Sequence, residues 1–215
     1  AEGWSFLVLL VAMPKLVSYL GEVSFGLFSI AWVIIGYLAF LDIGVNRAAT
    51  KFVSEHLATQ DLGSTRMIVR TAIRANLILG LVGAAAVSLT SPYLIHSVFR
   101  VPPEMQRQAQ VTFYVVAMAI PVSLVLGVFR AVLSSYQRFA YINTVNAAAT
   151  TLQWAAAALL AWKGYGAAVV VLATVIARVL AMAAYGIAVT RMFPGLQIVA
   201  FREMHGLSKL LRFGG

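Results

Sequence analysis

The chain has 215 residues, of which 61% are hydrophobic and 11% are charged, and its mean hydropathy is +0.89. Because average soluble domains are about 45–50% apolar and about 25% charged, this composition excludes an ordinary soluble domain and predicts a membrane protein. The absence of cysteine excludes disulfides and thiolate metal sites, and the net charge of +9 does not indicate nucleic acid, since the basic residues lie in short stretches between apolar runs.

Six apolar runs follow one another along the chain, each close to the roughly 20 residues that a membrane-spanning helix needs. They cover residues 4–20, 27–46, 75–95, 110–133, 144–162 and 166–190. Only helices and closed barrels satisfy their backbone in lipid, and the runs lack the alternation of a barrel strand. The predicted fold class is therefore an all-α polytopic membrane protein with six transmembrane helices. The longest polar connection, 47–66, is expected to be a loop.

The basic residues predict the orientation of these spans, because cytoplasmic loops are enriched in Lys and Arg. Of the 16 basic residues, 11 fall on one side of the predicted topology, three on the other and two inside spans. Both ends of the chain should therefore be cytoplasmic. The three on the sparse side are Arg100, Arg107 and Lys163.

Two domains are expected: residues 1–190 as a six-helix transmembrane lobe, and residues 191–215 as a cytoplasmic interfacial helix or a connector to a further span. A proline-glycine break opens this tail, and apolar and basic residues alternate after it. The chain begins without methionine and ends at LLRFGG, so we expect it to be part of a longer protein.

Small residues recur at every fourth position within several spans, which lets helices approach closely in lipid. This spacing predicts a compact bundle and says nothing about a substrate. The series are Gly80, Ala84 and Ser88; Ala119, Ser123 and Gly127; and Ala173, Ala177 and Ala181.

Charged residues within the spans are the candidates for a functional site, because an unpaired charge in the membrane is costly. Arg178 lies in the middle of the last span, so it should face the bundle interior, a carboxylate or water. Lys15 shares a helix face with Glu22. Its position inside a span is explained by a salt bridge to Glu22, by snorkelling to the interface or by a place in a cationic cavity. Asp42 is the one acidic residue well inside a predicted span. It is a possible partner for Arg178, an interfacial cap or an ion-coupling group.

Other basic residues form a second set of candidates. Arg66, Arg70 and Arg74 form a stripe entering the third span; the first two suit snorkelling, and Arg74 lies deepest. Arg130 follows Ser123 and Gly127 on one face of the fourth span. In the fifth span, Asn146 and Gln153 lie two turns apart on one face, which is more typical of helix packing than of ligand contacts.

Enzyme motifs are absent from the sequence: there is no HExxH, no phosphate-binding GxxxxGK[ST] and no GxSxG. The three histidines lie in separate connections, which argues against a metal site. No cofactor is expected, and we expect a protein without catalytic residues.

The order of several stretches resembles that of oligosaccharide flippases of the multidrug/oligosaccharidyl-lipid/polysaccharide superfamily, often described as polysaccharide biosynthesis proteins. The resemblance lies in LGEVSFGL followed by LDIGV and a basic segment, in VLSSYQRFAYIN after the fourth span, and in MFPGL after the sixth. It covers essentially the whole chain, although no single motif is highly specific.

The resemblance implies the amino-terminal lobe of a two-lobe transporter of the cytoplasmic (inner) membrane. It would flip polyprenyl-diphosphate-linked oligosaccharide by alternating access, for surface polysaccharide biosynthesis, with other polysaccharide-assembly membrane proteins as further partners. Inward-facing basic residues would receive the diphosphate or acidic sugars. The positions that suit this role by depth and helix face are Lys15, Arg47, Arg74, Arg130 and Arg178.

Two alternatives remain open. The first is a cation-coupled multidrug exporter of the same superfamily, in which Asp42 would bind the coupling ion. Within the predicted spans, arginines that are candidates for burial outnumber carboxylates, which disfavours a cationic drug as the substrate. The second is a membrane-embedded glycosyltransferase or polymerase, which would usually need a long extracytoplasmic loop or acidic catalytic residues there.

Overall fold

A computed structural model describes residues 2–37, 44–58 and 61–193, and in these ranges the chain is helical without any strand. This confirms the all-α fold class. The elements are α1 (Glu2–Tyr37), α2 (Val45–Ala58), α3 (Leu62–Tyr93), a π-helical turn η2 (Leu94–Val98), α4 (Pro103–Ser135), α5 (Phe139–Trp162) and α6 (Ala167–Met192). Asp42 and the tail from residue 194 lie outside the described residues, so the predicted domain at 191–215 stays a prediction.

Four of these helical stretches are long and apolar enough to cross a membrane: Phe6–Tyr37, Leu62–Val98, Pro103–Ser135 and Ala167–Met192. The first contains two predicted spans. The fifth predicted span corresponds to α5, which is of similar length but bears several amide and hydroxyl side chains. The chain is a multi-pass membrane protein, and each predicted apolar run coincides wholly or in part with a helix.

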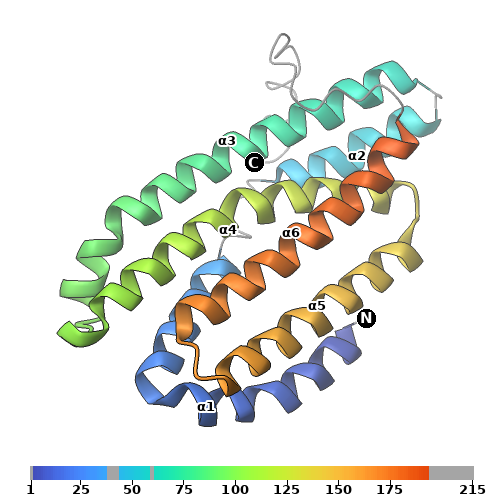
Figure 1. The fold of residues 1–215 in the computed structure, drawn as a ribbon. Coiled ribbons are helices and arrows are strands. Elements are labelled where there is room, and N and C mark those ends of the chain that lie inside the picture. Colours follow the sequence, from blue (N-terminus) through green and yellow to red (C-terminus); the bar gives the residue numbers. More distant parts are fainter. Residues whose placement is uncertain (1, 38–43, 59–60, 194–215) are drawn as a thin grey trace.

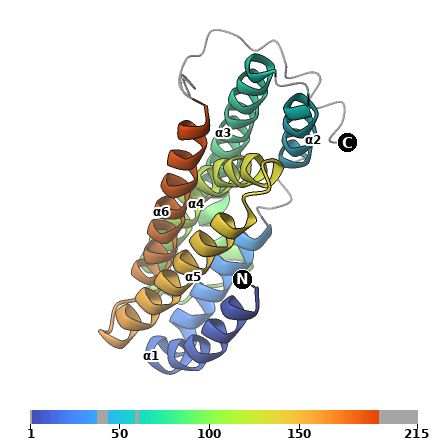
Figure 2. The ribbon, with the colours of Figure 1, turned by 90° about the vertical axis from the view of Figure 1, so that its right-hand side faces the viewer.

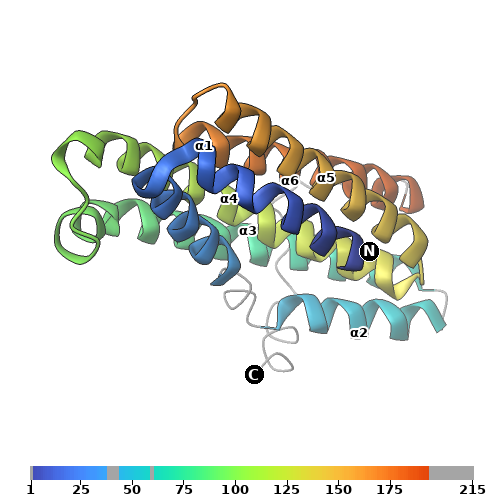
Figure 3. The same cartoon turned by 90° about the horizontal axis from the view of Figure 1, so that it is seen from below.

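Helix α1 is broken at Gly21, where φ is 71° and ψ is 167°. This positive φ favours glycine, because a Cβ would be strained there. Phe6 and Trp32 line the same cavity. At 1.5 Å per residue, their separation of 26 residues would place them about 39 Å apart in a straight helix. The two arms of α1 therefore fold back on one another, as Figure 3 shows in dark and lighter blue.

The predicted loop at 47–66 is wrong, because α2 occupies most of it. Val45, Ala48, Ala49 and Val53 are all buried, and their spacing forms one apolar helix face. The opposite face is polar, with Lys51 and Glu55 exposed and 4.0 Å apart. A short amphipathic helix has too few apolar residues for a spanning segment, which is why its composition resembled a loop.

Helix α3 begins well before its predicted start, because Asp61 caps it. The Asp61 carboxylate accepts hydrogen bonds from the backbone N–H and the hydroxyl of Ser64, at 3.0 and 2.6 Å. These bonds stabilise the ionised form and lower the pKa of Asp61 below its ordinary value. The stripe Arg66, Arg70 and Arg74 is consequently helical, and Arg74 is the most deeply buried of the three, at 6% exposure.

Helix α4 runs through the centre of the bundle, with α3 and α6 as its most extensive neighbours (Figure 1). Two clusters of buried side chains lie along it. One, nearer the Gly21 turn, joins α1, α4, α5 and α6; the other joins α2, α3, α4 and α6, with Ile142 of α5. Figure 2 shows α1 and α5 together on one flank of the molecule, with α2 and α3 at the opposite end.

Close packing between α3 and α4 confirms the small-residue prediction at Gly80. A Cβ added there would lie 2.5 Å from the Cα of Pro121, so nothing larger than glycine fits without a shift. The outward faces remain apolar: Leu89 is 81% exposed and Trp162 is 64% exposed. Such a surface suits lipid, in which exposed apolar side chains cost nothing.

Candidate functional site

A cavity of about 430 Å³ opens between α1, α4, α5 and α6. Among the described residues, its lining combines two guanidinium groups, several uncharged polar groups and aromatic rings, and it includes no carboxylate. The lining residues are Phe6, Leu9, Trp32, Leu126, Arg130, Asn146, Ala149, Thr150, Gln153, Trp154, Ala177, Arg178, Ala181 and Tyr185. We call it the cationic cavity.

Arg178 enters this cavity from the middle of α6. One terminal nitrogen, Nη1, donates a hydrogen bond to Ser123 Oγ at 3.3 Å, and the guanidinium carbon lies 5.9 Å from the centre of the Trp32 ring. Its Nε is buried without a hydrogen-bond partner among the described residues. A guanidinium has five N–H donors, so Arg178 retains donors for a ligand.

Arg130 lines the same cavity from the last turns of α4 and is exposed. Its position, five residues before Ser135, places it about 8 Å from the end of that helix. The two arginines therefore give the cavity a charge of plus two, with one of them deep and the other near the mouth. Guanidinium groups bind phosphate and carboxylate through paired hydrogen bonds, so the cavity favours an anion.

Helix α5 supplies the uncharged polar wall. Asn146, Thr150 and Gln153 occupy successive turns on one face and all line the cavity, with Gln153 only 8% exposed. The predicted common face of Asn146 and Gln153 is thus confirmed. The interpretation of Asn146 and Gln153 as packing contacts stays a prediction, and both residues also line the cavity.

Aromatic rings form the side of the cavity toward α1. Trp32 and Trp154 lie with ring centres 5.1 Å apart, tilted by 52°, and Phe28 stacks on Trp32 at 6.2 Å. Neither tryptophan was predicted as a site residue. A signal was available, since tryptophan in membrane helices favours the interfaces, whereas these two lie within predicted spans.

The remaining sequence candidates lie apart from this cavity. Lys15 lines a neighbouring cavity of about 390 Å³ between α1 and α5, with Trp154 as a shared wall. Arg74 is buried where α3 packs against its neighbours, and Arg47 is exposed on α2. The structure thus brings together Arg130 and Arg178, and the roles proposed for the five basic residues stay predictions.

The described residues contain no group of three or more His, Cys, Asp or Glu side chains that could hold a metal ion. Fold and cavity define the class: a multi-pass helical membrane protein with a cationic, aromatic-walled cavity. The chain belongs to the polysaccharide biosynthesis protein family, whose model matches residues 1–215. A search of curated proteins and a search of solved structures each return no significant match.

Proposed function

We propose that this chain is part of a flippase that moves polyprenyl-diphosphate-linked oligosaccharide across the cell membrane by alternating access. The family includes lipid-linked oligosaccharide flippases. The observation that carries the proposal is the convergence of Arg130 and Arg178 in one cavity, where no carboxylate of the described part of the chain joins them. A diphosphate group supplies the complementary charge, and no bond of the substrate needs to be broken.

The cavity has distinct surfaces for the two parts of such a headgroup. Arg178 and Arg130 offer charge-assisted hydrogen bonds to phosphate oxygens. Asn146, Thr150 and Gln153 offer hydrogen bonds to hydroxyl groups. The ring face of Trp32 can pack against a sugar ring. In a site shielded from water these interactions strengthen, because the local dielectric is low.

The test is translocation of a fluorescent polyprenyl-diphosphate sugar by the full-length protein in vesicles. We expect Arg178→Ala to slow translocation about tenfold or more, the equivalent of one lost charge-assisted hydrogen bond. Arg178→Lys, which keeps the charge but loses the forked geometry, should retain an intermediate rate. Arg107→Ala is the matched control, because Arg107 is exposed and outside the cavity.

The same assay separates the alternatives. Recovery of the lipid-linked sugar chemically unchanged supports transport, whereas lengthened glycans would identify a polymerase. Efflux of a cationic dye that is independent of Arg178 would favour the drug exporter. Normal translocation by folded Arg178→Ala protein would remove this arginine from the mechanism.

A further inference from the structure

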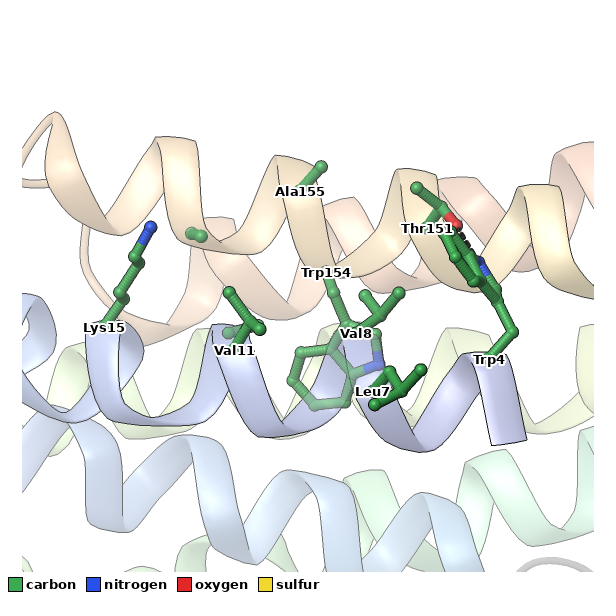
Figure 4. A pocket seen from close by; sticks show the side chains of 10 residues that line it. Trp4, Leu7, Val8, Val11, Lys15, Thr151, Trp154 and Ala155 are labelled. Atoms are coloured by element: carbon green, nitrogen blue, oxygen red, sulfur yellow. Dashed lines mark hydrogen bonds between the residues drawn. The ribbon is translucent and has the colours of Figure 1, made fainter. Parts of the chain in front are cut away.

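A second cavity lies between the first arm of α1 and α5 (Figure 4). Its volume is about 390 Å³, and we call it the α1–α5 groove. Lys15 and Trp4 lie at opposite ends of the groove, and the side chains between them are apolar. The lining residues are Trp4, Leu7, Val8, Val11, Ala12, Lys15, Thr151, Trp154, Ala155 and Ala158.

The Thr151 hydroxyl and the Trp4 indole of this groove already have hydrogen-bond partners. Trp4 Nε1 donates to Thr151 Oγ1 at 2.9 Å, and that hydroxyl donates to the carbonyl of Ala147 at 2.8 Å. The first of these bonds also ties α1 to α5 at the Trp4 end. The charged group available to a ligand is the ammonium of Lys15, whose side chain extends toward α5 in Figure 4.

Lys15 is exposed, and among the residues that the structure describes no carboxylate forms an ion pair with it. Glu22, the partner considered from the sequence, lies beyond the Gly21 break and is exposed without such a pair. The groove therefore combines an apolar trough with one available positive charge. Its chemical complement is a hydrocarbon chain that ends in an anionic group.

The length of the groove fits one membrane leaflet. From Trp4 to Lys15 is 11 residues, or about 16 Å at 1.5 Å per residue, and the hydrocarbon core of a bilayer is about 30 Å thick. Lys15 lies six residues before Gly21, so it is about 9 Å from that end of the bundle. A phosphate at Lys15 would thus lie near one interface, with its chain directed toward the membrane interior.

Apolar contact alone cannot select this ligand, because lipid tails already provide an apolar environment. Selectivity must come from Lys15 and from the adjacent position of the cationic cavity. Trp154 forms a wall of both spaces. A lipid whose headgroup occupies the cationic cavity therefore has the groove beside it as an apolar surface for its chain. An ordinary membrane phospholipid, whose headgroup is not bound in the cavity, does not gain this combination of contacts.

We propose that the α1–α5 groove binds the phosphate-proximal part of the polyprenyl chain of the transported lipid. Lys15 contacts the phosphate that bears the chain, while the sugar-side phosphate lies toward Arg178 in the cationic cavity. This inference rests on the proposed function and assigns the lipid part of the substrate to a place distinct from the cationic cavity. The hydrogen bond between Trp4 and Thr151 fixes the spacing of α1 and α5. Ala155 and Ala158 have small side chains, so the α5 side of the groove leaves room for a hydrocarbon chain.

The test uses a polyprenyl phosphate with a photoreactive diazirine on its chain, added to vesicles that contain the full-length protein. Labelled peptides should map to residues 4–15 and 151–158. Lys15→Gln should lower labelling about tenfold, as for one charge-assisted contact. Ala155→Phe, which fills the groove from an exposed position, should lower it as strongly. The matched controls are Lys163→Gln and Ala183→Phe, both exposed and outside the groove.

Three results would overturn the inference: equal labelling by the neutral polyprenol, loss of labelling in excess phosphatidylglycerol, or labelling that maps to other segments. The last would be expected if another part of the protein or a second copy covers the groove. Arg178→Ala separates the two proposals. Groove labelling without any sugar translocation refutes the proposed function alone, whereas Arg178-dependent translocation without groove labelling refutes this inference alone.

Discussion

At Gly80 the absence of a side chain sets the distance between α3 and α4, because a Cβ there would meet the backbone of Pro121. Pro121 cannot move aside easily, since its ring is part of the backbone of α4. We expect Gly80→Leu to lower the free energy of unfolding by about 1–3 kcal/mol or more, the usual cost of overpacking. The measurement is the apparent Tm in detergent.

Gly36→Leu is the control for this substitution. Gly36 is also helical and exposed, and nothing lies within 4 Å of a Cβ placed on it. Its variant should melt within a degree or two of the unchanged protein. If both variants lose the same stability, the effect comes from helix composition and not from contact with Pro121.

Arg178 places a charge inside the bundle, which is energetically costly, and the same charge can bind an anionic ligand. Its Ser123 hydrogen bond and the Trp32 ring stabilise the guanidinium inside the bundle. They satisfy only part of its donor capacity. The sequence predicted that this charge would face the bundle interior, a carboxylate or water, because a lone charge toward lipid is expensive. The partner type it suggested, Asp42, lies outside the described residues, while a tryptophan and a serine are the contacts shown.

At the scale of elements, α2 is attached to the bundle through a polar contact as well as its apolar face. Asn76 on α3 donates to Asn46 Oδ1 at 3.1 Å and to the carbonyl of Leu124 at 3.2 Å. It is fully buried, so removing its amide leaves polar groups on both neighbouring helices with a lost partner.

We therefore expect Asn76→Leu to speed amide hydrogen exchange in Val45–Ala58 more than in α5 or α6. The loss of buried hydrogen bonds should correspond to about 1–3 kcal/mol. Asn143→Leu is the control, since Asn143 is exposed on α5. Exchange that rises equally in every helix would indicate general destabilisation and would contradict a specific role for Asn76 in docking α2.

The elements also show which parts of the fold the sequence determines. Long apolar runs gave α3, α4 and α6, because spanning a membrane demands continuous hydrophobicity. Helix α2 was not predicted, because the four apolar residues of its buried face are separated by polar residues in the sequence. These four are Val45, Ala48, Ala49 and Val53. Arg130 and Arg178 were expected to face inward, but their meeting with Trp32 and Trp154 depends on how four helices pack, which local periodicity does not specify.

At the scale of the whole molecule, the fold-back of α1 at Gly21 determines which surfaces meet. It places both arms of α1 beside the same helices, so Phe6 and Leu9 from one arm and Trp32 from the other border one cavity. The first arm also forms the groove with α5. Had α1 continued straight with its first arm still on α5, the second arm could not border the cationic cavity, and Arg178 would lack the Trp32 ring.

The connections lie at two opposite ends of the bundle (Figure 1). The Gly21 turn and the segments around residues 99–102 and 163–166 are at one end, and α2 and the segment around 136–138 are at the other. Arg100 and Lys163 belong to connections at the first end, whereas Arg138 belongs to the connection at the second end and Arg47 and Lys51 belong to α2. Because basic residues concentrate on the cytoplasmic side, we propose that the α2 end is cytoplasmic.

Single cysteines test this orientation, since the 215 residues contain none of their own. On a cysteine-free background in intact cells, Arg100→Cys and Lys163→Cys should react with a membrane-impermeant maleimide, while Lys51→Cys and Arg138→Cys should react only after permeabilisation. All four residues are exposed, so differences in labelling report the side of the membrane. The reverse pattern would invert the topology, and Lys15 would then lie toward the cytoplasmic leaflet. The groove would in that case receive the lipid before its headgroup crosses, whereas the proposed orientation makes it the site for the lipid after crossing.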